Sequence, residues 1–201
     1  MVYPLRRLWY YPFWRVLIKK VKGMQNIPDK GNFIIVANHN KLLDPILVAY
    51  PIIKKLDKKV HFIASPRWWP YLGEYICLTW AGCIPLFNRK QAYKDAKKMI
   101  NEGEIVGIFP EGNIKKYPRR TKAGAIRLAI ETETPILPVK IESSYIPFVS
   151  IVSFDKIIYP DEIKKKYKNP ERLMSKIYNL GLDEVSQREV IDRRTDWISP
   201  Y

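Results

Sequence analysis

The sequence predicts a single α/β domain with a mostly parallel or mixed central sheet flanked by helices. Short apolar runs alternate along the chain with amphipathic segments, and this alternation is typical of strand–helix–strand units. Several of the runs carry no charge, as expected for strands that are buried on both faces of a sheet. With 201 residues, 47% of them hydrophobic, the chain can bury one packed core.

The first predicted strand follows Gly31 and covers residues 33–37, which are all apolar. Helices are predicted at 91–101, where apolar residues and lysines occupy opposite faces, and at 123–131. Past residue 143 the pattern weakens into a charged tail that we expect to be helical. The other predicted strands lie at 60–64, 83–87, 105–109, 136–141, 148–154 and 157–159.

The first 22 residues are predicted to form their own unit, an N-terminal amphipathic helix that associates with a membrane, ahead of one domain at 23–201. Apolar residues recur there at near-helical spacing, flanked by arginines and lysines. An ordinary helix that covers the core is the alternative, since Pro4 and Pro12 limit the helix length. A second insertion point is expected at the tryptophan pair near residue 68, where ordinary core aromatics are the alternative. The expected membrane contacts are Trp9, Phe13, Trp14, Trp68 and Trp69.

The net charge of +15 predicts an anionic partner: a membrane surface, a phosphorylated substrate or nucleic acid. Six tryptophans and thirteen tyrosines suit the water–lipid boundary, although aromatic rings also stack on single-stranded bases. The lysines and arginines are dispersed rather than gathered in a nucleic-acid reading motif, so no nucleic acid is expected. The sequence shows no signal peptide, and we expect a peripheral protein on the cytoplasmic face of an anionic membrane.

Residues 68–88 are long enough to cross a bilayer, but prolines, glycines and Glu74 interrupt them, so a continuous membrane helix is not expected. Cys77 and Cys83 are too few for a disulfide framework. With two histidines in the chain, no metal site is predicted.

The most informative stretch follows the first strand and contains His39 and Asp44. Pro45 favours a helix start, which predicts Asp44 as the N-cap residue. In a loop between strand and helix, Asp44 can also meet His39 and orient its imidazole. A histidine ordered by a carboxylate is a general base for an alcohol or water nucleophile. No Gly-x-Ser-x-Gly motif is present, so direct base catalysis is the simpler mechanism, with a structural histidine as the alternative.

A second candidate is Phe109-Pro110-Glu111-Gly112, which comes directly after the predicted strand 105–109. Ligands bind at the carboxyl ends of parallel strands, so a carboxylate followed by a glycine at this place suggests a binding site. A plain turn explains these residues almost as well.

Five segments together resemble the glycerolipid acyltransferases, a family typified by 1-acylglycerol-3-phosphate acyltransferase. They occur in the family's order and spread over residues 31–141. Asn38-His39 and Asp44 resemble the family's His-x4-Asp motif, and Phe109-Pro110-Glu111-Gly112 resembles its third block. Residues 82–89, which end in Arg89, resemble the second block, and residues 134–139 resemble the fourth. Lys122-Ala123-Gly124-Ala125 is similar to a segment that lies between the third and fourth blocks.

The resemblance implies that 23–201 is an acyltransferase domain that uses acyl-CoA or acyl-carrier protein as co-substrate and no cofactor. His39, held by Asp44, is expected to take a proton from the hydroxyl of a lysophospholipid, which then attacks the thioester. A glycerol 3-phosphate acceptor, another lysolipid, or a thioesterase reaction with water are the alternatives within the same fold. The residues expected to bind substrate are Asn38, Arg89, Glu111, Gly112 and Lys122.

Three departures from the family pattern concern the acceptor rather than the reaction. The third block continues with Asn113-Ile114 where the family usually has Thr-Arg, although basic residues follow closely. Ser65 stands where many members have a lysine, with Arg67 two residues on. The second block is one residue longer than the common form.

Overall fold

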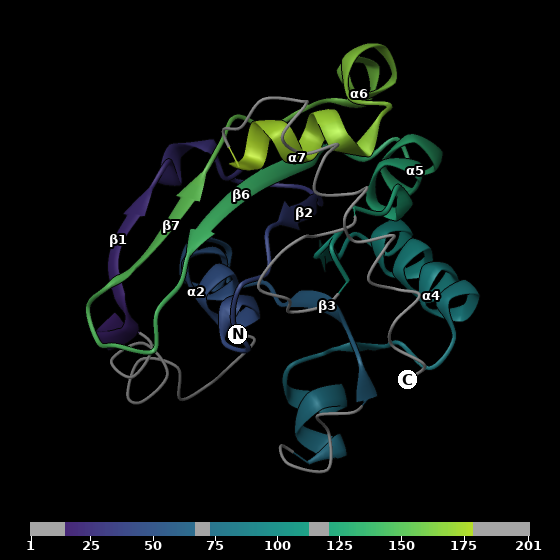
Figure 1. Cartoon of the computed structure of the whole chain (residues 1–201). Helices are drawn as coiled ribbons and strands as arrows, with labels where there is room; N and C mark the ends of the chain where they lie inside the picture. Colours follow the sequence, from purple (N-terminus) through teal and green to yellow (C-terminus); the bar gives the residue numbers. More distant parts are fainter. Residues whose placement is uncertain (1–14, 67–72, 113–120, 179–201) are drawn as a thin grey trace, which may run out of the picture.

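The computed structural model describes residues 15–66, 73–112 and 121–178, which form a seven-stranded mixed sheet with helices on both faces (Figure 1). The strand order is β1-β7-β6-β2-β5-β3-β4, so the α/β class predicted from the sequence is confirmed. The strands are β1 Ile18–Lys22, β2 Ile34–Ala37, β3 Val60–Ala64, β4 Ile84–Pro85, β5 Ile105–Ile108, β6 Ile136–Glu142 and β7 Ser150–Phe154. The helices are α2 Asp44–Leu56, α4 Arg89–Asn101, α5 Gly124–Glu131, α6 Pro160–Lys166 and α7 Pro170–Tyr178.

Strand β2 lies between β5 and β6 and runs parallel to both. Strands β3 and β4 continue the parallel arrangement beyond β5, whereas β7 is antiparallel to β6 and β1 is parallel to β7. Because β2 and β5 are neighbours, the loops that leave their carboxyl ends lie at the same edge of the sheet. Ligands of open α/β sheets bind at this kind of edge.

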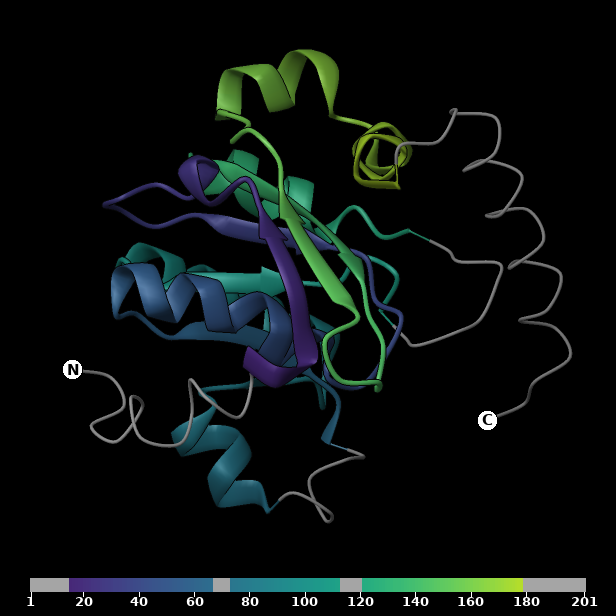
Figure 2. The same ribbon diagram turned by 90° about the vertical axis from the view of Figure 1, so that its left-hand side faces the viewer.

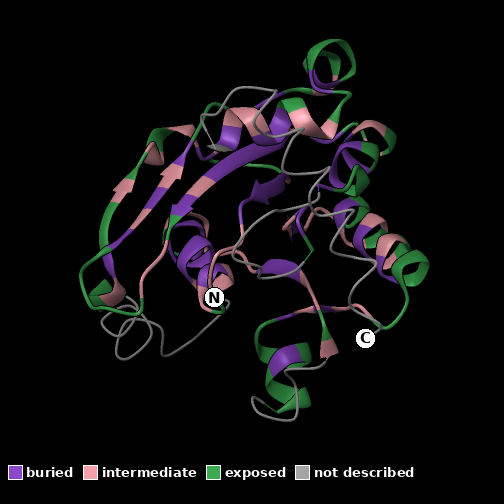
Figure 3. Cartoon of the chain, viewed as in Figure 1, coloured by how far each residue is buried: buried purple, intermediate pink, exposed green. Residues whose placement is uncertain are grey.

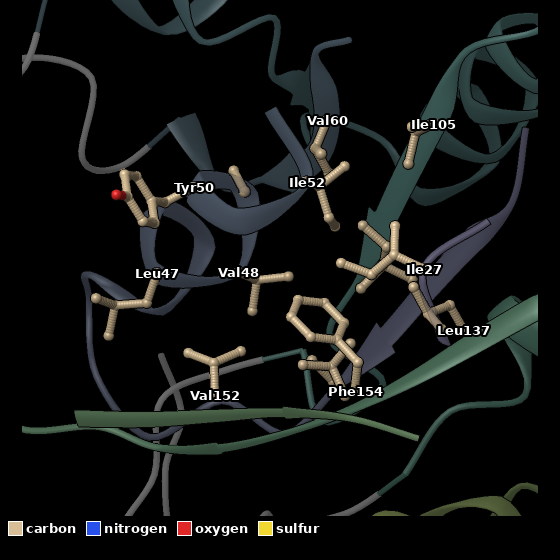
Figure 4. Close-up of a cluster of buried hydrophobic side chains, with 14 of the residues drawn as sticks. Ile27, Leu47, Val48, Tyr50, Ile52, Val60, Ile105, Leu137, Val152 and Phe154 are labelled. Atoms are coloured by element: carbon tan, nitrogen blue, oxygen red, sulfur yellow. The ribbon is translucent and has the colours of Figure 1, made fainter. Parts of the chain in front are cut away.

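The sheet is covered by α2 on one face and by α4 to α7 on the other (Figures 1 and 2). All four residues of β2 are buried: Ile35 and Ala37 pack with the α2 side, and Ile34 and Val36 with the opposite side. In the α2-side cluster, Leu47 and Val48 of α2 face side chains of β7 (Figure 4). Burial on both faces explains why β2 is a continuous apolar run.

Strand β2 leads to α2 on one face, whereas β5 leads to α5 on the other. The two chain segments therefore part at the edge of the sheet where both strands end. Such a topological switch point leaves room for side chains from both loops to converge on a ligand.

The N-terminal prediction was wrong for residues Ile18–Lys22, which form strand β1 instead of the end of an amphipathic helix. Ile18 and Val21 lie three apart, which fits helical spacing as well as this strand, in which Ile18 is fully buried. Pairing with β7 decides the outcome, because it satisfies the backbone, buries Ile18 and packs the half-buried Val21 against the core. The main domain thus includes residues before 23, and residues 1–14 lie outside the described part of the chain.

The predicted helices at 91–101 and 123–131 are found as α4 and α5. The charged tail contains α6 and α7, and its residues 179–201 lie outside the described residues. The strand predicted at 83–87 is limited to Ile84–Pro85, and the one at 157–159 is reduced to a single bridge between Ile136 and Ile158. Within 68–88, residues Ile76–Trp80 form a π-helix. In the part of the chain that the structure describes, no helix has the length and apolar character needed to cross a membrane.

Candidate active site

The loop after β2 begins with Asn38, whose side chain bonds both backbone groups of Ile141 in β6. Its amide nitrogen donates to the Ile141 carbonyl at 2.8 Å, and its oxygen accepts from the Ile141 N–H at 2.7 Å. The side chain thereby continues the β2–β6 pairing past the end of the strand. Asn38 was predicted to bind substrate, but it is buried and its amide is engaged, so the geometry favours a role in positioning the loop.

Asp44 and His39 are in contact, with Asp44 Oδ2 3.1 Å from His39 Nδ1. The same oxygen accepts the backbone N–H groups of Asn40 at 2.5 Å and Lys41 at 2.8 Å. Asp44 is fully buried, while 14% of the His39 side chain is exposed. The carboxylate is therefore fixed by the loop itself, and it in turn fixes the imidazole edge that faces it.

Asp44 does not cap α2 as predicted. The N-cap residue is Leu43, whose side chain makes no capping bond, and Asp44 is the first residue of the helix. The Asp44 carboxylate turns back toward the loop, where N–H groups of residues 40 and 41 supply the donors that the first helical turn otherwise offers. This backward turn is what brings Asp44 to His39.

The face of the His39 ring is held by Phe109, which comes from the loop after β5. The ring centroids lie 4.2 Å apart with 18° between the planes, and Phe109 stacks in turn on Phe62 of β3 at 5.2 Å. Because Asp44 is an acceptor for Nδ1, that nitrogen carries the proton of the neutral ring, which leaves the lone pair on Nε2. The imidazole is thus oriented at one edge and one face with its basic nitrogen opposite Asp44.

Glu111 and Gly112 are held beside the histidine by the loop after β5. Glu111 is buried, and its Oε2 accepts the backbone N–H of His39 at 3.4 Å, which is a long hydrogen bond. Gly112 has φ +68°, and a Cβ added there would lie 2.4 Å from the ammonium nitrogen of Lys122. The structure therefore brings together five predicted site residues. His39, Asp44, Glu111 and Gly112 lie in the two loops, and Lys122 lies against Gly112.

Arg89 is separate from this group. It is exposed at the first position of α4, where the side chain of Asn88 caps the helix by accepting from Lys90 N–H at 2.8 Å. Within the described residues, no hydrogen bond or ion pair joins Arg89 to His39 or Asp44. The five predicted membrane contacts and the basic residues 115–120 lie outside the described residues.

The glycine that opens the second block is held by a buried histidine of β3 that the sequence analysis did not single out. His61 Nδ1 lies 2.7 Å from the Gly82 carbonyl oxygen. Gly82 has φ +66°, and a Cβ added there would lie 2.8 Å from the His61 ring. Glycine is required by both the backbone conformation and the close ring. His61 thus anchors the start of the segment that leads through β4 to Arg89.

A comparison with protein families shows to which family the chain belongs. The family model Acyltransferase matches residues 19–142, which is more than half of the chain. The chain belongs to the acyltransferase family. The matched range begins in β1 and ends with β6, and it contains every residue of the group around His39.

Two curated relatives of this acyltransferase carry the same name. The 1-acyl-sn-glycerol-3-phosphate acyltransferase of Borreliella burgdorferi is 32% identical over 147 residues, which are 67% of this chain and 55% of the relative. The Bacillus subtilis protein of that name is 28% identical over 122 residues, which are 59% of this chain and 60% of the relative. The chain thus spans between 55% and 60% of the length of these relatives.

The acyltransferase fold is also seen in a solved structure. The crystal structure of the 1-acyl-sn-glycerophosphate acyltransferase PlsC from Thermotoga maritima superposes with a TM-score of 0.59 at 25% identity. The match covers 83% of this chain and 70% of that one. The mixed sheet and its covering helices are therefore shared with a protein of the same family.

Proposed function

We propose that this acyltransferase moves a fatty acyl group from acyl-CoA or acyl-carrier protein to the free hydroxyl of a lysophospholipid such as 1-acylglycerol 3-phosphate. The observation that carries the proposal is the 3.1 Å contact between His39 Nδ1 and Asp44 Oδ2 in the loop after β2. It leaves Nε2 as a base, which alcohol attack on a thioester requires. The names of the two curated relatives support the choice of acceptor.

In the proposed reaction, His39 Nε2 takes the proton of the acceptor hydroxyl while the oxygen attacks the thioester carbonyl carbon. A C–O bond forms, the C–S bond then breaks, and the imidazolium returns its proton to the departing thiolate. Asp44 keeps the ring in the required tautomer and stabilises its protonated form. A positioned general base of this kind is worth about 10²- to 10⁴-fold in rate.

The acceptor phosphate is assigned to two cations, Lys122 beside the loop and Arg89 on α4. The Lys122 ammonium lies against Gly112, in the loop that bonds the His39 backbone, and Arg89 lies exposed at the start of α4. Charge-assisted hydrogen bonds from such groups are stronger than neutral ones and suit a phosphate monoester. Glu111 shapes the loop from its buried position.

We place the enzyme on the cytoplasmic face of an anionic membrane as a peripheral protein. The net charge of +15 supports this location, because each lysine or arginine near an anionic leaflet contributes about 1 kcal/mol. A lipid acceptor also resides in such a leaflet.

The proposal is tested with purified full-length chain and a labelled acyl thioester, supplied with and without lysophospholipid. We expect labelled diacyl phospholipid to form only when the acceptor is present. Acyl-CoA and acyl-carrier protein are compared as donors, and glycerol 3-phosphate is compared as an alternative acceptor. Release of free fatty acid at the same rate with and without acceptor would assign a thioesterase instead. Binding of DNA that vesicles do not compete away would favour the nucleic-acid alternative.

A further inference from the structure

We propose that the loop between β6 and β7, residues 145–149, inserts into an anionic phospholipid bilayer beside the candidate active site. The inference goes beyond the proposed function, and the membrane contacts predicted from the sequence lie elsewhere in the chain. We call these five residues the docking loop.

The docking loop gathers large apolar side chains on the surface. The exposed fractions of these residues are 57% for Tyr145, 65% for Ile146, 59% for Phe148 and 45% for Val149. Figure 3 shows the connection between β6 and β7 as an exposed segment at the edge of the molecule. Single exposed hydrophobic residues are ordinary, but a contiguous group of this size marks an interaction surface.

Hydrogen bonds at its base give the docking loop a defined conformation. Ser150 is fully buried, and its hydroxyl donates to the Ser144 carbonyl at 3.1 Å and accepts the Ser144 N–H at 3.0 Å. The Ser144 hydroxyl in turn accepts the Ile146 N–H at 3.0 Å. These bonds close the base of the loop, so the exposed apolar side chains are presented by a built scaffold.

Phe148 has a strained backbone conformation. Its φ is +57°, a conformation that a bulky L-residue rarely adopts. The Phe148 N–H donates to the Val16 carbonyl at 2.6 Å, which ties the loop to the start of β1. Such strain persists where the surrounding contacts impose it, and it clusters at binding sites.

A basic rim adjoins the loop on the β1 side. Arg15 directly precedes Val16, and Ile18 pairs with Ser150, the residue that follows the docking loop. An open cavity of about 210 Å³ lies between β1 and α2. Four of the residues that line the cavity are basic, and none is acidic: Arg15, Lys19, Lys20 and Lys54. These four basic side chains give the β1 side of the loop a positive charge.

The opposite side of the loop is also cationic. Lys41 Nζ lies 4.8 Å from the centroid of the Tyr145 ring. Glu142, which ends β6 before the loop, is paired with Lys140 at 3.3 Å. An apolar tip between positive flanks matches a bilayer, which offers hydrocarbon below a layer of negative phosphates. This charge arrangement is the reason to choose an anionic lipid surface over an apolar protein partner.

The docking loop touches the loop that carries His39. The hydroxyl of Tyr145 accepts the backbone N–H of Leu42 at 3.4 Å, and Leu42 is itself an exposed apolar residue. A bilayer seated on the docking loop therefore lies next to residues 39–44. If the proposed function holds, a lysophospholipid can reach His39 from the leaflet without dissolving in water.

The first experiment places an environment-sensitive fluorophore on the full chain at Ile146→Cys, in a background with Cys77→Ala and Cys83→Ala. The matched control is Tyr159→Cys, another exposed aromatic position, at the start of α6. We expect the emission at position 146 to shift to the blue on adding vesicles that contain phosphatidylglycerol, with no shift at 159. Vesicle binding without a shift at 146 overturns the proposal, whichever other segments bind lipid.

The second experiment measures co-sedimentation of Ile146→Asp/Phe148→Asp with the same vesicles. The control is Tyr159→Asp/Asn169→Asp, which adds the same two negative charges at exposed positions elsewhere. We expect at least about a tenfold loss of partitioning for the double variant, because two large apolar side chains no longer enter the hydrocarbon. Unchanged partitioning contradicts the proposal. Lys19→Gln/Lys20→Gln should weaken binding to anionic vesicles and leave binding to neutral vesicles unchanged. If the wild type binds neutral and anionic vesicles equally, the basic rim has no part in docking.

The two proposals fail separately. Vesicle binding is measured without turnover, and His39→Ala should bind vesicles as the wild type does. A wild type that binds vesicles through the docking loop but transfers no acyl group overturns the proposed function and leaves the docking surface in place.

Discussion

The ring of His39 lies 4.2 Å from the ring of Phe109, and the two residues come from loops that leave neighbouring strands of the sheet. One loop supplies the proposed base and the residue that orients its edge, and the other supplies the platform under its face. The pairing of β2 with β5 thus determines how the imidazole is held.

Replacing His39 with alanine should lower kcat for acyl transfer by at least about 10²-fold, because no other base is held at this position. The side chain is partly exposed, so Tm should change by less than about 4 °C, the shift that about 1 kcal/mol produces in a chain of this size. Steady-state kinetics and thermal unfolding check both values. Transfer at more than a tenth of the wild-type rate would remove His39 from the role of base.

Asp44→Asn should lower kcat by about 10²-fold or more, because the amide can donate to Nδ1 and so favour the wrong tautomer. Its oxygen can still accept from Asn40 and Lys41, so the loop should remain folded. Asp44→Ala leaves those two N–H groups without an acceptor and should also destabilise the protein by about 1–3 kcal/mol. Asp161→Asn, an exposed aspartate of α6, is the control and should leave kcat and Tm unchanged.

Phe109→Leu should lower kcat by about 2- to 10-fold while KM stays constant, since stacked rings contribute about 0.5–1.5 kcal/mol beyond their buried area. Phe109 positions His39 and is not assigned a contact with substrate. Phe109→Tyr keeps the stacked ring and should restore kcat. A leucine variant with a higher KM and wild-type kcat would place Phe109 in substrate binding instead.

Gly112→Ala should raise KM for the acceptor, because the new Cβ would lie 2.4 Å from the Lys122 ammonium and displace it. The positive φ adds backbone strain of about 1 kcal/mol. Gly103→Ala is the matched control: it has φ +85°, but its Cβ meets nothing within 4 Å. Both variants should lose stability, and only Gly112→Ala should change KM.

Arg89→Ala should raise KM for a phosphate-bearing acceptor by about tenfold and leave kcat nearly constant, as expected for a contact equal in ground and transition states. Lys90→Ala removes a neighbouring exposed cation of the same helix and serves as the control. An unchanged KM in the Arg89 variant would exclude this arginine from the acceptor site.

Much of the fold follows from local pattern. The uncharged run at 33–37 predicts a strand buried on both faces, and β2 has that property. The helix predicted at 91–101 is present as α4, with Ala92, Ala96 and Ile100 buried at helical spacing. Residues Ile18–Lys22 were assigned wrongly, because nothing near them in sequence shows the strand β7 with which they pair. A helical and an extended chain both satisfy so short an apolar pattern.

The reacting groups can be identified from the sequence alone: a histidine and an aspartate after a buried strand, with blocks that resemble one acyltransferase family. How these groups are held depends on the packing of the folded chain, because the contacts join residues far apart in the sequence. Asn38 is engaged by Ile141, the His39 ring rests on Phe109, and Tyr145 touches the site loop. Spacing along a chain fixes which residues can share a loop, whereas strand order and packing fix which loops meet.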